Sequence, residues 1–188
     1  MEYFIWQGYF PGSGHAFAET QKGLSDEQAM DILAGAKLTA PPKNVVVNEL
    51  SDGELPDLLE SAWSSKIVSQ TLRKILEKSC RDCVQYISAK LSDYPDEKYS
   101  IANVTTKVAA LDREKSKVTT FPRPPHAIKK VSKLVLKPLE TDTPSIFHLE
   151  EMPSLVLVSE TLRKELEAAS SSAGRFIKVQ DYRHPQQR

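Results

Sequence analysis

The sequence predicts an α+β protein in which a mixed or antiparallel sheet carries two repeated strand-helix-strand units. The first observation is a repeated phrase, because "VSQTLRKILEK" at 68–78 returns as "VSETLRKELEA" at 158–168. The second is that a β-branched apolar run, "KIV" or "LVLV", precedes each copy, and the third is that most other segments look like short strands. Two related units are too few for a solenoid, so we expect residues 1–188 to form a single domain.

Each repeated unit is predicted to begin its helix at a serine. Ser69 and Ser159 are expected N-caps, since a serine hydroxyl accepts a hydrogen bond from the first free amides of a helix. Leucines four apart give each helix one apolar stripe: Leu72 and Leu76, then Leu162 and Leu166. A short strand follows each helix, "CVQYISA" at 83–89 and "RFIKVQ" at 175–180.

The remaining elements are predicted from alternation, short apolar runs and turn residues. Strands are expected, in chain order, at 3–6, 44–50, 99–111, 117–121, 131–137 and 145–149. Residues 25–38 are a helix candidate, and "LPDLLESAW" at 55–63 is predicted to be a short helix with Pro56 in its first turn.

The composition of the chain limits the compartment in which it is expected and the kinds of partner it can bind. The formal net charge is zero, which gives no overall attraction to nucleic acid or anionic lipid. No apolar run reaches the roughly 18 residues that span a membrane, and the first residues lack the pattern of a signal peptide. Two cysteines cannot build a disulfide framework in 188 residues, which fits a reducing compartment. We therefore expect a cytoplasmic protein.

Acidic residues gather in "ELSDGELPDLLE" at 49–60, which contains no base. The five acids are Glu49, Asp52, Glu54, Asp57 and Glu60. Such a run is commonly a solvated loop and helix start, where the helix dipole favours acids. The alternative is a surface that opposes a basic partner, such as the nucleic-acid groove of a nuclease.

Basic residues gather in residues 113–137, which contain eight bases and the single acid Glu114. Lys and Arg neutralise phosphates and Phe121 could stack on a base, so this stretch is the best argument for nucleic-acid binding. Its bases alternate with apolar residues, however, which is the pattern of amphipathic strands with one solvated face. That pattern favours the solvated face.

No segment predicts a catalytic, metal or cofactor site. "CRDC" at 80–83 has redox spacing, but it follows the predicted helix, where the dipole disfavours a thiolate, so we assign both thiols to packing. The four histidines are scattered without metal-ligand spacing, and His148 in "IFHL" is expected to belong to a strand.

Taken in order, several phrases resemble a family of immunity proteins from bacterial polymorphic toxin systems. They are "LPDLLES", "KIVSQTLRKILEK", "VQYISAKL", "YSIANVTTKVAALDREKS", "SIFHL", "LVLVSETLRKELEAA" and "GRFIKV". The resemblance covers Glu49 to Val179, and residues 1–48 are expected to be an N-terminal extension of the same domain. It implies a cytoplasmic protein without enzymatic activity that binds and neutralises a cognate toxin.

The resemblance supplies no binding residues, so these are predicted from charge. A nuclease toxin would face the acidic residues Glu49, Asp52, Glu54, Asp57 and Glu60. An alternative surface is the proline-rich loop with Phe121, Arg123 and His126. The rival function is a nucleic-acid-binding accessory protein that uses residues 113–137.

Overall fold

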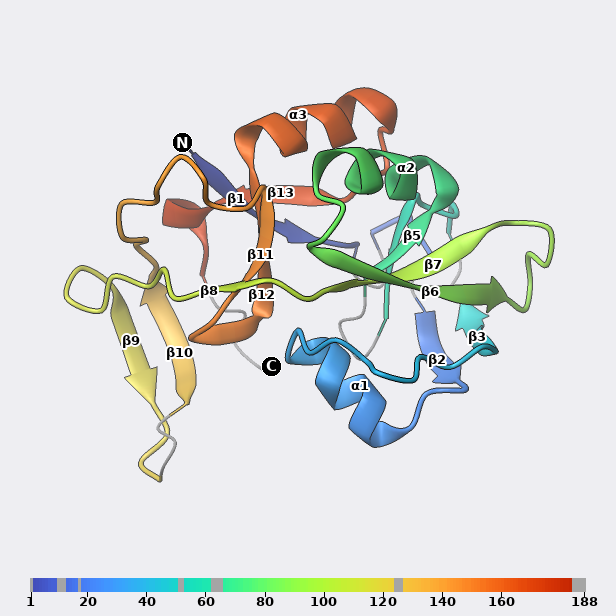
Figure 1. Ribbon diagram of the computed structural model, residues 1–188, viewed down its shortest axis with the longest axis horizontal. Coiled ribbons are helices and arrows are strands. Elements are labelled where there is room, and N and C mark those ends of the chain that lie inside the picture. Colours follow the sequence, from blue (N-terminus) through green and yellow to red (C-terminus); the bar gives the residue numbers. More distant parts are fainter. Residues whose placement is uncertain are drawn as a thin grey trace.

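The computed structural model describes residues 2–9, 13–16, 18–50, 53–61, 66–123 and 127–183, with backbone alone for 19–21 and 49–50. Two mixed sheets meet under a pair of helices, which confirms the α+β class (Figure 1).

Six of the described strands form the first sheet. In spatial order they are β2 (Ala18–Lys22), β3 (Val45–Leu50), β6 (Val84–Leu91), β7 (Tyr99–Val104), β5 (Lys66–Ser69) and β4 (Leu58–Glu60). The pair β3 and β6 is parallel and the other pairs are antiparallel. β7 is buried along its whole length, as expected for a strand covered on both faces.

Five more described strands form the second sheet. Their order is β13 (Arg175–Lys178), β1 (Tyr3–Gln7), β12 (Met152–Ser159), β11 (Ile146–Leu149) and β8 (Lys107–Val108). Here β11 and β8 are parallel, and the other pairs are antiparallel.

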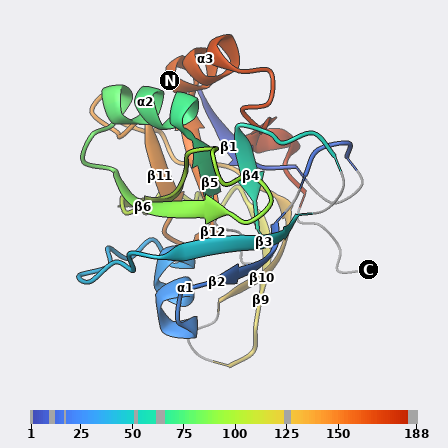
Figure 2. The same ribbon diagram turned by 90° about the vertical axis from the view of Figure 1, so that its right-hand side faces the viewer.

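Two helices lie side by side across both sheets: α2 (Gln70–Ser79) and α3 (Glu160–Ala169) (Figures 1 and 2). The predicted N-caps are confirmed, because the Ser69 hydroxyl accepts from the Leu72 amide and that of Ser159 from the Leu162 amide. The helix leucines pack into one cluster with residues of both sheets, including Trp6. This shared core joins the two sheets.

Each helix belongs to a strand-helix-strand segment, β5-α2-β6 or β12-α3-β13. In each segment the two strands are separated by a third strand that pairs with both. β7 lies between β5 and β6 and is antiparallel to both. In the same way β1 lies between β12 and β13 and is antiparallel to both. In the second segment, β12 and β13 are therefore joined in the sheet through β1, a strand from the N-terminal part of the chain.

The predicted helix in residues 25–38 is confirmed as α1 (Asp26–Leu33), which lies on the side of the molecule opposite α2 and α3 (Figure 2). Ser25 and Gln28 form a capping box, in which each side chain bonds the other residue's amide. Ala29 and Ile32 are its buried residues.

Among the described strands, β9 (Lys117–Thr120) and β10 (Ile128–Lys133) pair with each other alone, and they project from the body as a ribbon (Figure 1). A short 3-10 helix, η1 (Val179–Asp181), follows β13.

The prediction of a short helix at 55–63 is wrong. Residues Leu58–Glu60 form strand β4, and residues 62–65 lie outside the described part of the chain. Leu58 and Leu59 are both fully buried, one in each of two core clusters. Adjacent side chains on opposite sides fit the two-residue period of a strand, whereas a helix would turn them to neighbouring positions.

Candidate functional site

Asp57, one of the five predicted acids, lies inside a hydrogen-bond network. Its carboxylate accepts from the hydroxyl of Ser69, from that of Ser170 at 2.6 Å and from that of Ser172 at 3.4 Å. Its own amide donates to the Ser172 hydroxyl at 3.0 Å. Because Ser69 caps α2 and the other two serines follow α3, Asp57 joins the start of one helix to the end of the other.

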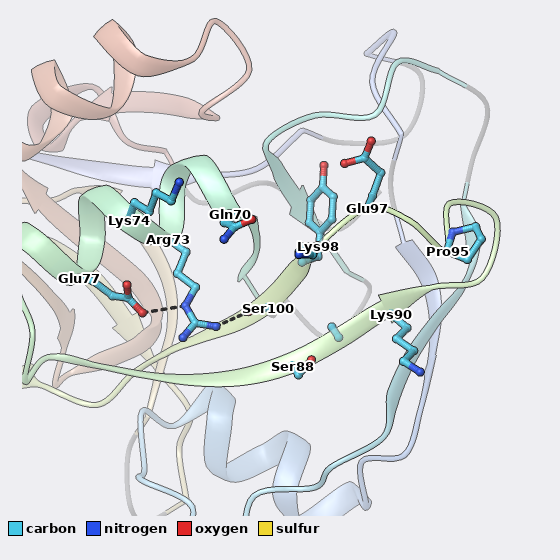
Figure 3. Close-up of a pocket in the computed structure, with 12 residues that line it drawn as sticks. Gln70, Arg73, Lys74, Glu77, Ser88, Lys90, Pro95, Glu97, Lys98 and Ser100 are labelled. Carbon is cyan, nitrogen blue, oxygen red and sulfur yellow. Dashed lines mark hydrogen bonds and ion pairs between the residues drawn. The ribbon is translucent and has the colours of Figure 1, made fainter.

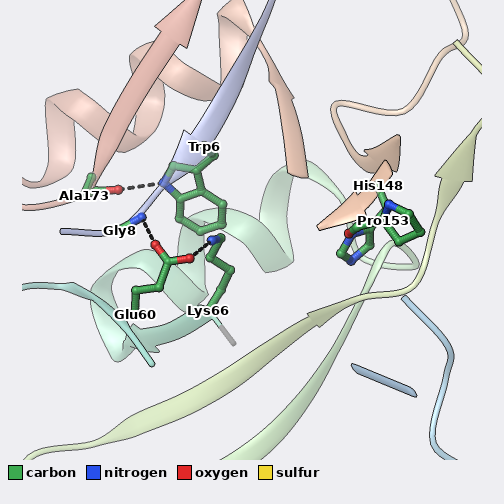
Figure 4. Close-up of polar contacts among 7 residues, drawn as sticks. All are labelled: Trp6, Gly8, Glu60, Lys66, His148, Pro153 and Ala173. Atoms are coloured by element: carbon green, nitrogen blue, oxygen red, sulfur yellow. Dashed lines mark hydrogen bonds and ion pairs between the residues drawn. The ribbon is translucent and has the colours of Figure 1, made fainter. Parts of the chain in front are cut away.

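Glu60 is also used internally. It pairs with the Lys66 amine at 2.5 Å, and the two side chains are 17% and 6% exposed. Its second carboxylate oxygen accepts from the Gly8 amide, so the pair connects β4 and β5 to the end of β1 (Figure 4). Beside it, the indole of Trp6 donates to the Ala173 carbonyl at 2.7 Å. A buried charge pair of this kind holds segments in register rather than meeting a partner.

Glu54 is the predicted acid that the described structure leaves exposed. Its backbone is fixed by bonds to Gly14 and Ala16. Asp52 and the side chain of Glu49 lie outside the described residues. The described structure therefore turns Asp57 and Glu60 inward and does not bring the predicted acids together on one surface.

The basic stretch forms the ribbon and its flanks, and we call residues 113–137 the basic arm. Its bases all belong to the described part of the chain and all are exposed: Arg113, Lys115, Lys117, Arg123, Lys129, Lys130, Lys133 and Lys137. Phe121 is 48% exposed, with the Lys129 amine 5.8 Å from its ring centroid. His126, the third residue of the predicted alternative surface, lies outside the described residues.

The base of the basic arm is firmly attached to the second sheet. Val131 and Leu134 are 1% exposed and pack with Phe147 and Leu149 of β11. The Ser116 hydroxyl donates to the Val135 carbonyl at 3.1 Å and accepts from the Val135 amide at 2.9 Å. The arm is therefore a projection with a fixed base.

A groove of about 670 Å³ opens where the basic arm meets β13, and we call it the arm groove. Half-buried or exposed apolar side chains line it: Leu136, Pro138, Leu139 and Val179. Exposed lysines surround them: Lys115, Lys133, Lys137 and Lys178. Among the described lining residues Glu2 is the one acid, and it pairs with Lys178 at 3.4 Å.

A second basic hollow, of about 500 Å³, lies between α2 and the β6–β7 hairpin (Figure 3). Its bases are Arg73, Lys74, Lys90 and Lys98. Arg73 donates to Glu77 at 2.7 Å and to Ser100 at 3.1 Å, and lies 4.7 Å from the ring centre of Tyr86.

The same arginine arrangement occurs on α3. Arg163 pairs with Glu167 and lies 4.4 Å from the ring centre of Phe4. Each of these arginines therefore holds its helix to an aromatic residue of a strand. Arg73, in the α2 hollow, has a structural role.

The cysteine prediction needs correction, because Cys80 and Cys83 form a disulfide instead of packing as free thiols. The turn that follows α2 brings their Cα atoms within 5.4 Å, inside the range that a disulfide spans. Sequence reasoning weighed the dipole at this helix end and overlooked the turn.

His148 lies in strand β11 as predicted and is 5% exposed. Burial lowers its pKa to about 4, and its Nδ1 donates to the Pro153 carbonyl (Figure 4). A neutral histidine enclosed in this way is a packing residue. Among the described residues no cluster of His, Cys, Asp and Glu could hold a metal ion, and no helix is long and apolar enough to cross a membrane.

The arm groove is the feature that sequence reasoning missed. Its signal is "KLVLKPL" at 133–139, where lysines flank apolar residues ahead of a proline. Residues 131–137 are a predicted strand, but β10 stops at Lys133 and the following residues line the groove.

Comparison with known proteins gives one family. A family model described as "Immunity protein family (Imm11)" matches residues 7–181. The match begins well before Glu49, so it includes most of the segment that we expected to be an extension. No curated protein matches the chain.

Proposed function

The chain belongs to the Imm11 immunity protein family, and from this membership we propose that it neutralises a cognate toxin by binding it tightly. The proposed action is non-enzymatic and takes place in the cytoplasm of a bacterial producer. Binding would cover the active cleft of the toxin or block the path of its substrate.

The observation that carries the proposal is the extent of the family match. Residues 7–181 take in the first sheet, the second sheet except most of β1, the three described α-helices and the basic arm. The family unit is therefore nearly the whole described fold, which favours an activity of the folded surface. Preorganised surfaces of this kind bind without a large ordering cost.

The proposal predicts that the cognate toxin is encoded next to this protein, and the product of that reading frame is the partner for the test. Co-expression should restore growth of cells that carry the toxin, and the two purified proteins should elute together in size-exclusion chromatography. Growth arrest that persists despite soluble protein, together with separate elution, would contradict the proposal.

We also propose a nuclease as the toxin, supported by the acidic segment 49–60. Glu54 is exposed, whereas Asp57 and Glu60 are engaged internally, so the charge available to meet a basic cleft is smaller than the sequence suggests. If the segment faces such a cleft, Glu54→Gln should slow association with the toxin at low salt. An unchanged association rate would remove Glu54 from the interface.

The exposed basic arm supports the second candidate, a nucleic-acid-binding accessory protein. Eight exposed bases with one acid among them would contact phosphates, and such binding weakens steeply as salt rises. Fluorescence anisotropy with labelled DNA and RNA at several salt concentrations decides this: salt-sensitive binding supports the candidate, and no binding at low salt excludes it.

A further inference from the structure

We propose that the basic arm and the arm groove together form a docking surface for an acidic segment of the toxin that also carries apolar side chains. The proposal deepens the proposed function and rests on it. It names which face of the protein binds and the chemistry of the segment that fits.

Positive and negative charges are separated along the chain. The arm has eight bases against one acid, while the whole chain has 25 of each, so the rest of the chain holds seven more acids than bases. Since every base of the arm is exposed, the arm produces a positive electrostatic potential that extends into solvent. A field of this kind attracts an acidic surface and speeds its approach.

The arm groove combines apolar side chains with lysines. Leu136, Leu139 and Val179 offer apolar contact within it. The lysines around these side chains would pair with carboxylates of a bound segment. An apolar centre with a charged rim is the usual organisation of a protein interface.

The surface is held in place before any partner binds. Backbone bonds fix the arm side of the groove to the preceding segment: the Lys137 amide donates to the Ala110 carbonyl at 2.8 Å, and the Asp112 amide to the Val135 carbonyl at 2.9 Å. Asp112 also pairs with Lys115 at 3.1 Å. A fixed groove loses little conformational entropy on binding.

Protection of strand edges does not account for the arm. Lysines on exposed edges prevent unwanted strand pairing, but Arg113, Lys115 and Lys137 lie outside the two paired strands of the arm. Nine charged positions, eight of them basic, indicate a partner of the opposite sign.

The lining also favours protein over nucleic acid. Nucleic-acid grooves place aromatic rings under successive bases. Phe121 is the one Phe, Tyr or Trp in residues 113–137. Tyr3 also lines the groove but is only 3% exposed, so leucine, valine and proline supply the accessible apolar surface. Aliphatic contacts of this kind suit leucine-like side chains of a peptide.

The test compares two charge reversals of equal size. The arm variant is Lys130→Glu, Lys133→Glu and Lys137→Glu, and the control is Lys74→Glu, Lys90→Glu and Lys98→Glu in the α2 hollow. All six lysines are exposed, so both variants should keep the melting temperature of the wild type. Association with the neighbouring-frame toxin is followed by stopped flow at about 0.01 M and about 1 M salt, where the Debye length is about 30 Å and about 3 Å.

We expect the arm variant to associate about 100-fold more slowly at the lower salt, with most of the difference lost at the higher salt, while the control stays within about threefold. Leu139→Ala should weaken binding about tenfold at both salt concentrations, because an apolar contact is not screened. The same proteins are titrated with labelled single-stranded DNA as the competing partner.

Each other outcome overturns the proposal in a different way. If the wild-type protein does not bind the toxin, the proposed function fails and this inference fails with it. If the wild type binds and the arm variant associates at the wild-type rate, or no more slowly than the control, toxin binding stands and the arm is not its surface. If the arm variant loses DNA binding alone, the arm is a nucleic-acid surface.

Discussion

Replacing Asp57 tests whether this acid supports the fold or meets a partner. In Asp57→Ala the hydroxyls of Ser69 and Ser170 lose their carboxylate acceptor. A hydrogen bond to a charged group contributes about 1.5–3 kcal/mol. Because Asp57 is half-buried, we take the low end for each of the two bonds and expect a loss of about 3 kcal/mol in the free energy of unfolding.

A loss of this size is easily measured in a protein of 188 residues. It corresponds to a fall of about 6–12 °C in melting temperature. Urea unfolding should show a lower midpoint with an unchanged slope, since the surface exposed on unfolding is the same. A double-mutant cycle with Ser170→Ala should give a coupling energy of about 1–2 kcal/mol, because the two residues share one bond.

Glu54→Gln is the control, since Glu54 is exposed. It should change the free energy of unfolding by less than about 0.5 kcal/mol. The reasoning would be refuted if Asp57→Ala were as stable as Glu54→Gln, and an association rate slowed equally by both would return Asp57 to the toxin interface.

The remaining predictions concern the core, the buried histidine and the disulfide. Leu166→Ala should cost about 2–5 kcal/mol in urea unfolding, because Leu166 is fully buried, and a loss below about 0.5 kcal/mol would contradict its place in the core. The pKa of His148 falls from 6.5 unfolded to about 4 folded, so the unfolded chain binds its proton first on acidification. The contribution of this group to the free energy of unfolding should be constant above about pH 6.5, fall by up to about 3 kcal/mol towards pH 4 and be constant again below that. His148→Gln should remove this part of the pH dependence. An unchanged pH profile would contradict the lowered pKa of His148. Cys80→Ser with Cys83→Ser should lower stability by about 2 kcal/mol, the small effect of a short loop, and leave toxin binding intact; lost binding in a folded variant would give the disulfide a functional role.

Local signals in the sequence predicted local structure well. Ser69 and Ser159 are the predicted caps, and Leu72, Leu76, Leu162 and Leu166 form the predicted stripes, because capping and helical spacing act over only a few residues. Strand β2 was missed, since "AETQK" has neither alternation nor a β-branched run. It is held by its pairing with β3, which no local pattern contains.

In the candidate site, too, local features were predictable and features that depend on distant residues were not. That residues 113–137 form a basic, exposed surface followed from their composition. The inward positions of Asp57 and Glu60 could not be predicted, because their partners Ser170 and Gly8 are far away in the sequence. The arm groove likewise needs residues around Leu136 and Val179, which only the folded chain brings together.

The place of β1 between β12 and β13 has a consequence for synthesis on the ribosome. Tyr3–Gln7 is made about 150 residues before Met152–Ser159, which at about 5–20 residues per second leaves the early strand waiting about 8–30 s. During that time Ile5 and Trp6, both fully buried in the finished protein, have no sheet to enter. Assembly of the second sheet is therefore a late event in synthesis. A nascent chain that stalls before residue 152 exposes the apolar side chains of β1, which chaperones can bind.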